Sequence, residues 1–167
     1  MFEVGDIVVY PIHGVARIAA IQNENIGGEE ELCYILETEM KTGNHRPVIK
    51  LPVSKAEANG VRRVVDETQV GKVIEILKQR SSKTDSLTWN KRHREYQEKM
   101  RTGSIYQAAE VFRDLTLLKE TKDLSHGERK LFDQARNLLI KELSIVKRTD
   151  EGEIERTIAK IFSDKPL

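Results

Sequence analysis

Three cationic side chains lie within five residues of the only tryptophan in this chain of 167 residues. The tryptophan is Trp89, and the cations are Lys91, Arg92 and Arg94. Lysine and arginine attract phosphates and release counterions from nucleic acid. An indole ring can wedge against a base, or stack on it, where a duplex is distorted or open. These residue types at this spacing could therefore hold DNA by its backbone and by one base step.

A helix is predicted to carry this segment, with Thr88 as its N-cap. Helical spacing from Trp89 leads to His93, Tyr96 and Met100. From residue types alone, such a stripe favours packing of the indole in a core over contact with DNA, and a protein interface is the third alternative. The cations could likewise form a solvated helix face. The positive N-terminal end of a helix prefers acids, yet the first turn after Trp89 has none, so an anion such as a phosphate would be stabilised there.

Composition limits the class of protein. The chain is 38% hydrophobic and 33% charged, and its net charge is +1, which is too balanced for a general DNA-coating protein. We therefore expect weak DNA binding that depends on a partner for placement. No apolar run approaches the ~20 residues of a membrane span, and the start of the chain does not resemble a secretory signal. A single cysteine, Cys33, excludes an internal disulfide and fits a reducing cytoplasm.

Residues 1–65 are rich in short β-branched runs separated by turns, which predicts a small SH3-like or Tudor-like β-barrel. Such modules bind partners, and an exposed edge strand could recruit a partner strand. Lys50 could then pair with an acidic partner residue, or could simply protect the edge from self-association. Phe2, Cys33 and Tyr34 are predicted core residues, and the acids 29–31 are predicted to lie in a turn. The predicted strands are Ile7–Tyr10, Val15–Ile21, Leu32–Leu36, Pro47–Leu51 and Val61–Val65.

Residues 66–167 carry apolar side chains at helical spacing and predict a compact all-α bundle of five helices, so the fold class is α+β. Capping boxes are predicted where an N-cap residue precedes Glu or Gln by three positions. No phosphate-binding loop, metal-ligand spacing or catalytic constellation is present, so we expect neither an enzyme nor a cofactor, metal or small-molecule substrate. The predicted boxes are Asp66–Gln69, Ser104–Gln107 and Ser125–Glu128.

Several motifs, in order along nearly the whole chain, resemble the CarD family of bacterial transcription factors. The first third also resembles the polymerase-binding module of the transcription-repair coupling factor, although no helicase motif follows. The motifs are Gly5-Asp6, Val8-Val9-Tyr10-Pro11, His13-Gly14-Val15, Leu51-Pro52, Thr88-Trp89-Asn90-Lys91-Arg92, Ala109-Glu110-Val111, Arg113-Asp114-Leu115, Leu124-Ser125 and Gly127-Glu128-Arg129-Lys130.

The resemblance implies a division of labour. The barrel would bind the β subunit of bacterial RNA polymerase, and the helical domain would reach promoter DNA at the upstream edge of the transcription bubble. Trp89 would wedge into the minor groove and oppose bubble collapse, without reading a specific sequence. Lys91, Arg92 and Arg94 would contact phosphates. The protein would lie in the cytoplasm, at the nucleoid through polymerase, with no role for a membrane.

The same resemblance implies polymerase-binding residues. Lys50, directly before the Leu51-Pro52 motif, and Pro52 within it match positions of the family that contact polymerase. Glu24 stands where some members carry arginine, which would weaken or rearrange the contact with an acidic partner patch. The alternative function is a protein–protein adaptor without DNA contact, and it requires Trp89 to be buried.

Overall fold

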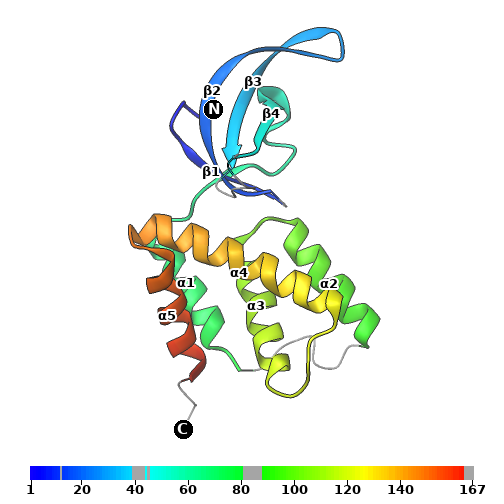
Figure 1. Cartoon of the computed structure of the whole chain (residues 1–167), viewed down its shortest axis with the longest axis vertical. Coiled ribbons are helices and arrows are strands. Elements are labelled where there is room, and N and C mark those ends of the chain that lie inside the picture. Colours follow the sequence, from blue (N-terminus) through cyan, green and yellow to red (C-terminus); the bar gives the residue numbers. More distant parts are fainter. Residues whose placement is uncertain (12, 39–43, 45, 81–87, 164–167) are drawn as a thin grey trace. The chain divides into compact units, whose positions relative to one another are not determined.

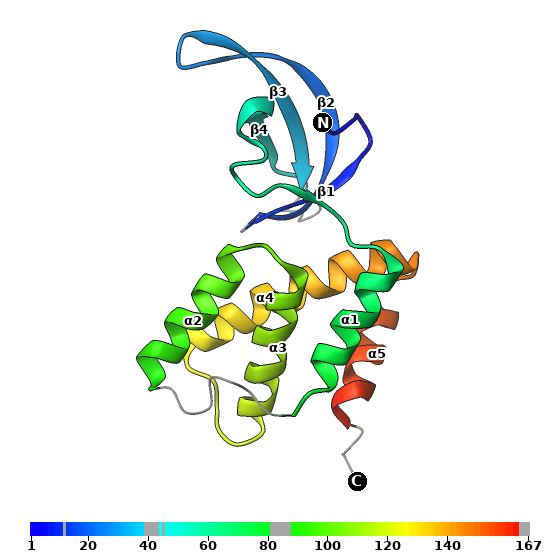
Figure 2. The same ribbon diagram turned by 180° about the vertical axis from the view of Figure 1, so that it is seen from behind.

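The structure is a computed structural model that describes residues 1–11, 13–38, 44, 46–80 and 88–163. The chain divides into two compact units, Met1–Val64 and Val65–Leu167. The first is built from strands and the second from helices (Figures 1 and 2), so the α+β class is confirmed. Within the described residues, every helix is too short or too polar to cross a membrane.

The first unit holds one five-stranded antiparallel sheet in the order β4-β3-β2-β1-β5. A short 3-10 helix, Val53–Lys55, follows β4. The edge strands β4 and β5 do not pair with each other in the described ranges, so closure into a barrel stays a prediction. The strands are β1 Ile7–Tyr10, β2 Gly14–Ile26, β3 Glu29–Thr38, β4 Val48–Pro52 and β5 Arg62–Arg63.

A tight turn joins the two longest strands, β2 and β3. Gly27 and Gly28 both have positive φ, 63° and 93°, a conformation that glycine adopts without a steric cost. Because these two residues complete the turn, strand pairing begins at once, with Glu29 opposite Ile26. The prediction that acids 29–31 lie in a turn is therefore wrong: they form the start of β3.

The core of the sheet unit contains the predicted aromatic residues. Tyr34 is buried and its hydroxyl accepts a hydrogen bond from the backbone N–H of Phe2 at 3.0 Å. The Phe2 ring packs against Tyr34, with 5.6 Å between ring centroids. Cys33 is also buried, and burial raises the pKa of its thiol above the usual value. The predictions for these three residues are confirmed.

The helical unit contains the five expected helices around a shared apolar core. Each helix buries its apolar stripe against the others, and α3 is the most buried of them. The helices are α1 Glu67–Lys78, α2 Trp89–Arg101, α3 Ile105–Lys119, α4 His126–Lys147 and α5 Glu151–Ser163.

Two of the three predicted capping boxes form. Asp66 caps α1 and Ser125 caps α4, each with the reciprocal bond from the third helical residue. Ser104 precedes α3 but its hydroxyl makes no capping bond, so the third box is wrong. The backbone N–H of Ser104 donates instead to Oγ1 of Thr102 at 3.2 Å, which takes the role predicted for the Gln107 side chain.

The box at α4 makes the stability of the helical unit sensitive to acid. Burial alone would raise the pKa of Glu128, but hydrogen bonds from Ser125 and the ammonium of Lys122 hold it below the ordinary value of 4.5. Because the folded pKa is the lower one, this stabilisation is present above the ordinary pKa and is lost as pH falls through the folded value. We expect thermal unfolding, followed by circular dichroism, to move to lower temperature below about pH 4.5.

A Glu128→Gln variant supplies the comparison. Its melting temperature should be lower than that of wild type at neutral pH and should fall less steeply in acid, because the titrating group is gone. Equal falls in the two proteins would show that Glu128 does not set this dependence.

Buried polar contacts tie the helices together. Arg113 of α3 donates through Nη1 to the carbonyl of Ile76 at 3.3 Å and to Oε1 of Gln79 at 2.7 Å, at the end of α1. Its guanidinium also contacts the buried carboxylate of Asp114 at 2.9 Å. On α4, the fully buried Glu142 accepts the backbone N–H of Val65 at 2.8 Å. The Arg113-Asp114 motif is therefore explained by its structural contacts.

Candidate nucleic-acid interface

Trp89 is the first residue of α2 and lies on the surface. The indole is 46% exposed, so the structure does not support the core-packing alternative. Tyr96, on the same predicted stripe, is only 2% exposed and packs in the core instead. Thr88 is the N-cap, as predicted, but its side chain makes no capping bond. The start of α2 thus presents a large ring to solvent.

The indole is supported by a histidine one turn along the helix. The rings of Trp89 and His93 are stacked, with 5.4 Å between centroids and 7° between planes. His93 in turn lies against Gly127 in the first turn of α4. Sequence reasoning placed His93 only on an apolar stripe and quoted Gly127 only as part of a motif. The i, i+4 spacing of Trp89 and His93 could have predicted that the two rings contact each other on the helix.

The three predicted cations are available to an anion. Lys91 and Arg94 are exposed and Arg92 is half-buried. The ion pairs of α2 with described residues involve Lys99 and Arg101, in the second half of the helix. No acid lies in the first turn, as predicted. The start of α2 therefore combines the helix's partial positive charge with three cations that no described carboxylate neutralises.

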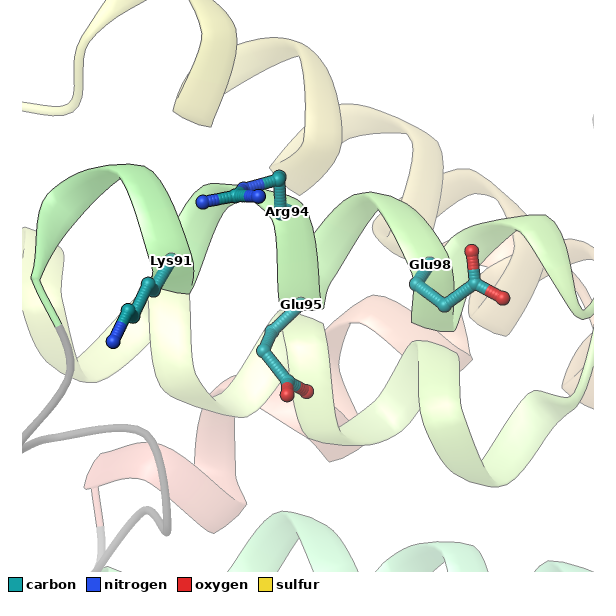
Figure 3. A pocket seen from close by; sticks show the side chains of 4 residues that line it. All are labelled: Lys91, Arg94, Glu95 and Glu98. Atoms are coloured by element: carbon teal, nitrogen blue, oxygen red, sulfur yellow. The ribbon is translucent and has the colours of Figure 1, made fainter.

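Figure 3 shows how the charges change along this face of α2. Lys91 and Arg94 line a surface depression together with Glu95 and Glu98, and the guanidinium of Arg94 is directed toward the start of the helix. Glu98 is engaged by Arg101, whose hydrogen bond lowers the pKa of that carboxyl below its usual value. Along this face of α2 the two cations come first and the two acids follow, with Glu95 directly after Arg94.

The first turn of α4 reaches this surface through Gly127. In both ribbon views α2 runs beside the N-terminal half of α4 (Figures 1 and 2), and Gly127 approaches the ring of His93. Arg129 and Lys130 are exposed and follow Gly127 on the same turn. Sequence reasoning did not connect Gly127 with Trp89, because only the folded chain brings the two helices together. Over the residues that the structure describes, no cluster of three potential metal ligands occurs.

The predicted polymerase-binding residues lie in the sheet unit. Lys50 is exposed on the edge strand β4, and its Nζ forms an ion pair with Oε2 of Glu24 at 3.1 Å. The pKa of Glu24 is lowered below its usual value. The main cause is a hydrogen bond from the Gln22 side chain at 2.7 Å, and the hydrogen bond from Lys50 is the second. Pro52 is buried at the end of β4, so it offers little surface to a partner. Sequence reasoning missed the pairing of Lys50 with Glu24.

Comparison with known proteins gives two family matches and a relative. Residues 2–65 match the family described as "CarD-like/TRCF RID domain", and residues 72–159 match "CarD, C-terminal domain". A protein of Bacillus subtilis (strain 168), named "Putative transcription factor YdeB", is 33% identical over 155 residues. That alignment covers 93% of this chain and 98% of the relative.

Proposed function

Because the chain belongs to the CarD family, we propose that it is a transcription regulator that stabilises the open promoter complex of bacterial RNA polymerase. In this proposal residues 1–65 bind the polymerase β subunit, and residues 66–167 contact promoter DNA at the upstream edge of the bubble. The observation that carries the DNA contact is the exposed indole of Trp89, at the positive end of α2, beside three cations that form no ion pair with a described carboxylate.

The indole has the chemistry of a wedge at a bubble edge. A flat apolar ring gains contact area when it enters a groove whose base steps are partly unstacked, and an intact duplex offers it less. Lys91, Arg92 and Arg94 would hold the adjacent phosphates without reading sequence. Because tethering to polymerase raises the local DNA concentration, the chain's small net charge is sufficient.

The sheet unit supports the polymerase contact through its edge. β4 is an outer strand with an exposed cation, Lys50, at its centre, which suits a partner that offers both a strand and an acid. The match to a domain type shared by CarD-like and TRCF proteins also favours this role for residues 2–65. A regulator of this kind acts in the cytoplasm, and we propose no catalytic activity, cofactor or membrane contact for it.

The protein–protein adaptor is the second candidate, and it differs in the role of Trp89. It requires that ring to be buried in a protein core or interface. The 46% exposure of the indole excludes burial in the chain's own core, and the cations around it favour DNA over a protein interface.

The lifetime of promoter open complexes tests the proposal directly. Complexes of bacterial RNA polymerase and promoter DNA are formed with and without the full chain and are then challenged with a competitor. We expect the chain to lengthen the lifetime and the effect to weaken with added salt, because phosphate contacts are salt-dependent. Polymerase binding with an unchanged lifetime would favour the adaptor.

Glu24→Gln tests the polymerase contact. The change releases the ammonium of Lys50 from its ion pair and removes an acid from a surface proposed to face acidic residues. We expect roughly two- to fivefold tighter binding to the β subunit, in line with the small energies of exposed ion pairs. Surface-immobilised β subunit and a titration of the chain give the affinity.

The matched control is Glu57→Gln, because Glu57 is exposed in the same unit and the net charge changes equally. It should leave the affinity unchanged. Tighter binding by both variants to the same extent would mean that overall charge, and not release of Lys50, is responsible.

A further inference from the structure

We infer that His93, seated against Gly127, is a positioning residue that holds the Trp89 indole outward in the orientation that meets DNA. The consequence for DNA rests on the proposed function. The positioning itself is a property of the free protein. Its basis is a stack of three groups from two helices, Trp89 and His93 on α2 and Gly127 on α4.

The first step concerns the freedom of the indole. Trp89 is the first helical residue of α2, and its N-cap Thr88 makes no side-chain bond that would fix the helix end. An exposed side chain at such an end samples several rotamers unless a neighbour restricts it. The 7° angle between the Trp89 and His93 rings shows a parallel stack, which restricts the indole from one side.

The second step concerns what fixes the histidine. A Cβ atom added at Gly127 would come within 2.9 Å of Cε1 of His93, 3.5 Å of Nε2 and 3.7 Å of Nδ1. The edge of the imidazole that carries both nitrogens therefore faces the backbone of α4. Nδ1 is buried and has no hydrogen-bond partner in the described part of the chain. The ring is thus held by close packing, and an apolar ring could take its place.

The third step concerns the glycine. Gly127 has no positive φ, so the backbone conformation does not demand glycine. Glycine is also among the poorest helix formers, so a residue with a side chain would favour α4. Space is the remaining reason, because only glycine leaves room for the imidazole. Gly71 in α1 provides the contrast, since a Cβ there meets nothing within 4 Å.

The experiment joins two measurements on the full chain. Trp89 is the only tryptophan, so time-resolved fluorescence anisotropy reports the local motion of this one indole in the free protein. The lifetime of promoter open complexes with bacterial RNA polymerase reports the effect on DNA. The variants are Gly127→Ala, His93→Ala and His93→Phe, with Gly71→Ala as the matched glycine control, and circular dichroism establishes that each is folded.

We expect Gly127→Ala and His93→Ala to increase the local motion of the indole and to remove at least half of the lifetime extension. Polymerase binding should stay at the wild-type level in both. His93→Phe should restore an ordered indole and most of the lifetime, and Gly71→Ala should match wild type in both measurements. An indole of wild-type mobility in folded Gly127→Ala and His93→Ala would overturn the inference.

The two ideas fail separately. If wild type does not lengthen the lifetime, the proposed function fails, and the anisotropy alone then decides whether His93 and Gly127 position the indole. If Gly127→Ala does not fold, the two His93 variants decide. Loss of indole order in His93→Ala and its return in His93→Phe would support the positioning role of His93. Equal indole mobility in His93→Ala and His93→Phe would overturn the inference.

Discussion

Trp89→Ala is expected to shorten the open-complex lifetime reached with the wild-type chain by about tenfold, which corresponds to ~1.4 kcal/mol. The reason is that the indole is the large apolar group on this surface that can fill a distorted groove, and alanine leaves that contact empty. Because Trp89 is 46% exposed and outside the core, the substitution should change the thermal unfolding temperature little. Competitor challenge and circular dichroism measure the two quantities.

Trp89→Phe is the matched variant for this experiment. It retains a ring that can stack on His93 but has less area, so its lifetime should fall between those of wild type and Trp89→Ala. All three proteins should bind the polymerase β subunit equally, because the sheet unit is untouched. A folded Trp89→Ala protein that extends the lifetime as wild type does would refute the wedge.

Arg113→Ala is expected to destabilise the helical unit by about 3–5 kcal/mol, the cost of breaking a buried ion pair. The Arg113 side chain is 6% exposed, and that of Asp114 is 2% exposed. Alanine removes the guanidinium beside the Asp114 carboxylate and also the donor to the carbonyl of Ile76. Urea unfolding followed by circular dichroism gives the free energy of unfolding, and a large fall is expected.

Arg136→Ala provides the comparison, because it also removes an arginine that forms an ion pair and bonds one helix to another. Arg136 pairs with Glu155 at 2.7 Å, but the two side chains are 38% and 46% exposed. Its loss should cost no more than about 1 kcal/mol, since water and salt screen exposed pairs. Similar losses for the two variants would mean that burial does not set the strength of the Arg113 contacts.

Helix positions could be predicted because their signals are local. The apolar period of 3.6 and the caps at Asp66 and Ser125 each lie within a few consecutive residues, and the structure confirms them. In the box at Ser104 the reciprocal bond is lost, because Oγ1 of Thr102 accepts the Ser104 N–H in place of the Gln107 side chain. A rule that considers only the four residues of the box cannot register such competition.

Strand lengths in the sheet unit were less predictable. β2 continues from Ile21 to Ile26 through residues that are mostly exposed, and β3 begins with three acids. Alternation of apolar and polar residues reveals a strand only where one face is buried. The outer part of this hairpin extends beyond the apolar core, so pairing continues there without that signal. Barrel closure depends on pairing between distant strands and could not be derived from local patterns.

The candidate site was predictable in one part and not in another. Trp89 and its cations are contiguous, so their chemistry is visible in the sequence. Two other contacts join segments far apart in the chain. They are the packing of His93 against Gly127 and the ion pair of Lys50 with Glu24. Only tertiary packing brings such residues together. The functions assigned to them remain predictions for the experiments above.

The register of β4 determines how its backbone faces a partner. The N–H of Thr38 donates to the carbonyl of Pro47 at 3.0 Å, at the end of the β3–β4 ladder. In an antiparallel pair the bonded residues recur at every second position, so Ile49 and Leu51 direct their N–H and C=O groups toward β3.

Val48 and Lys50 therefore direct their backbone groups away from the sheet, and Pro47 and Pro52 have no N–H to donate. A strand added at this edge can accept hydrogen bonds from two backbone N–H groups of β4, those of Val48 and Lys50. So short a ladder gives little main-chain affinity and cannot serve as a template for long stacked assemblies. Selection among possible partners at this edge must then come mainly from side chains, with the cation of Lys50 foremost.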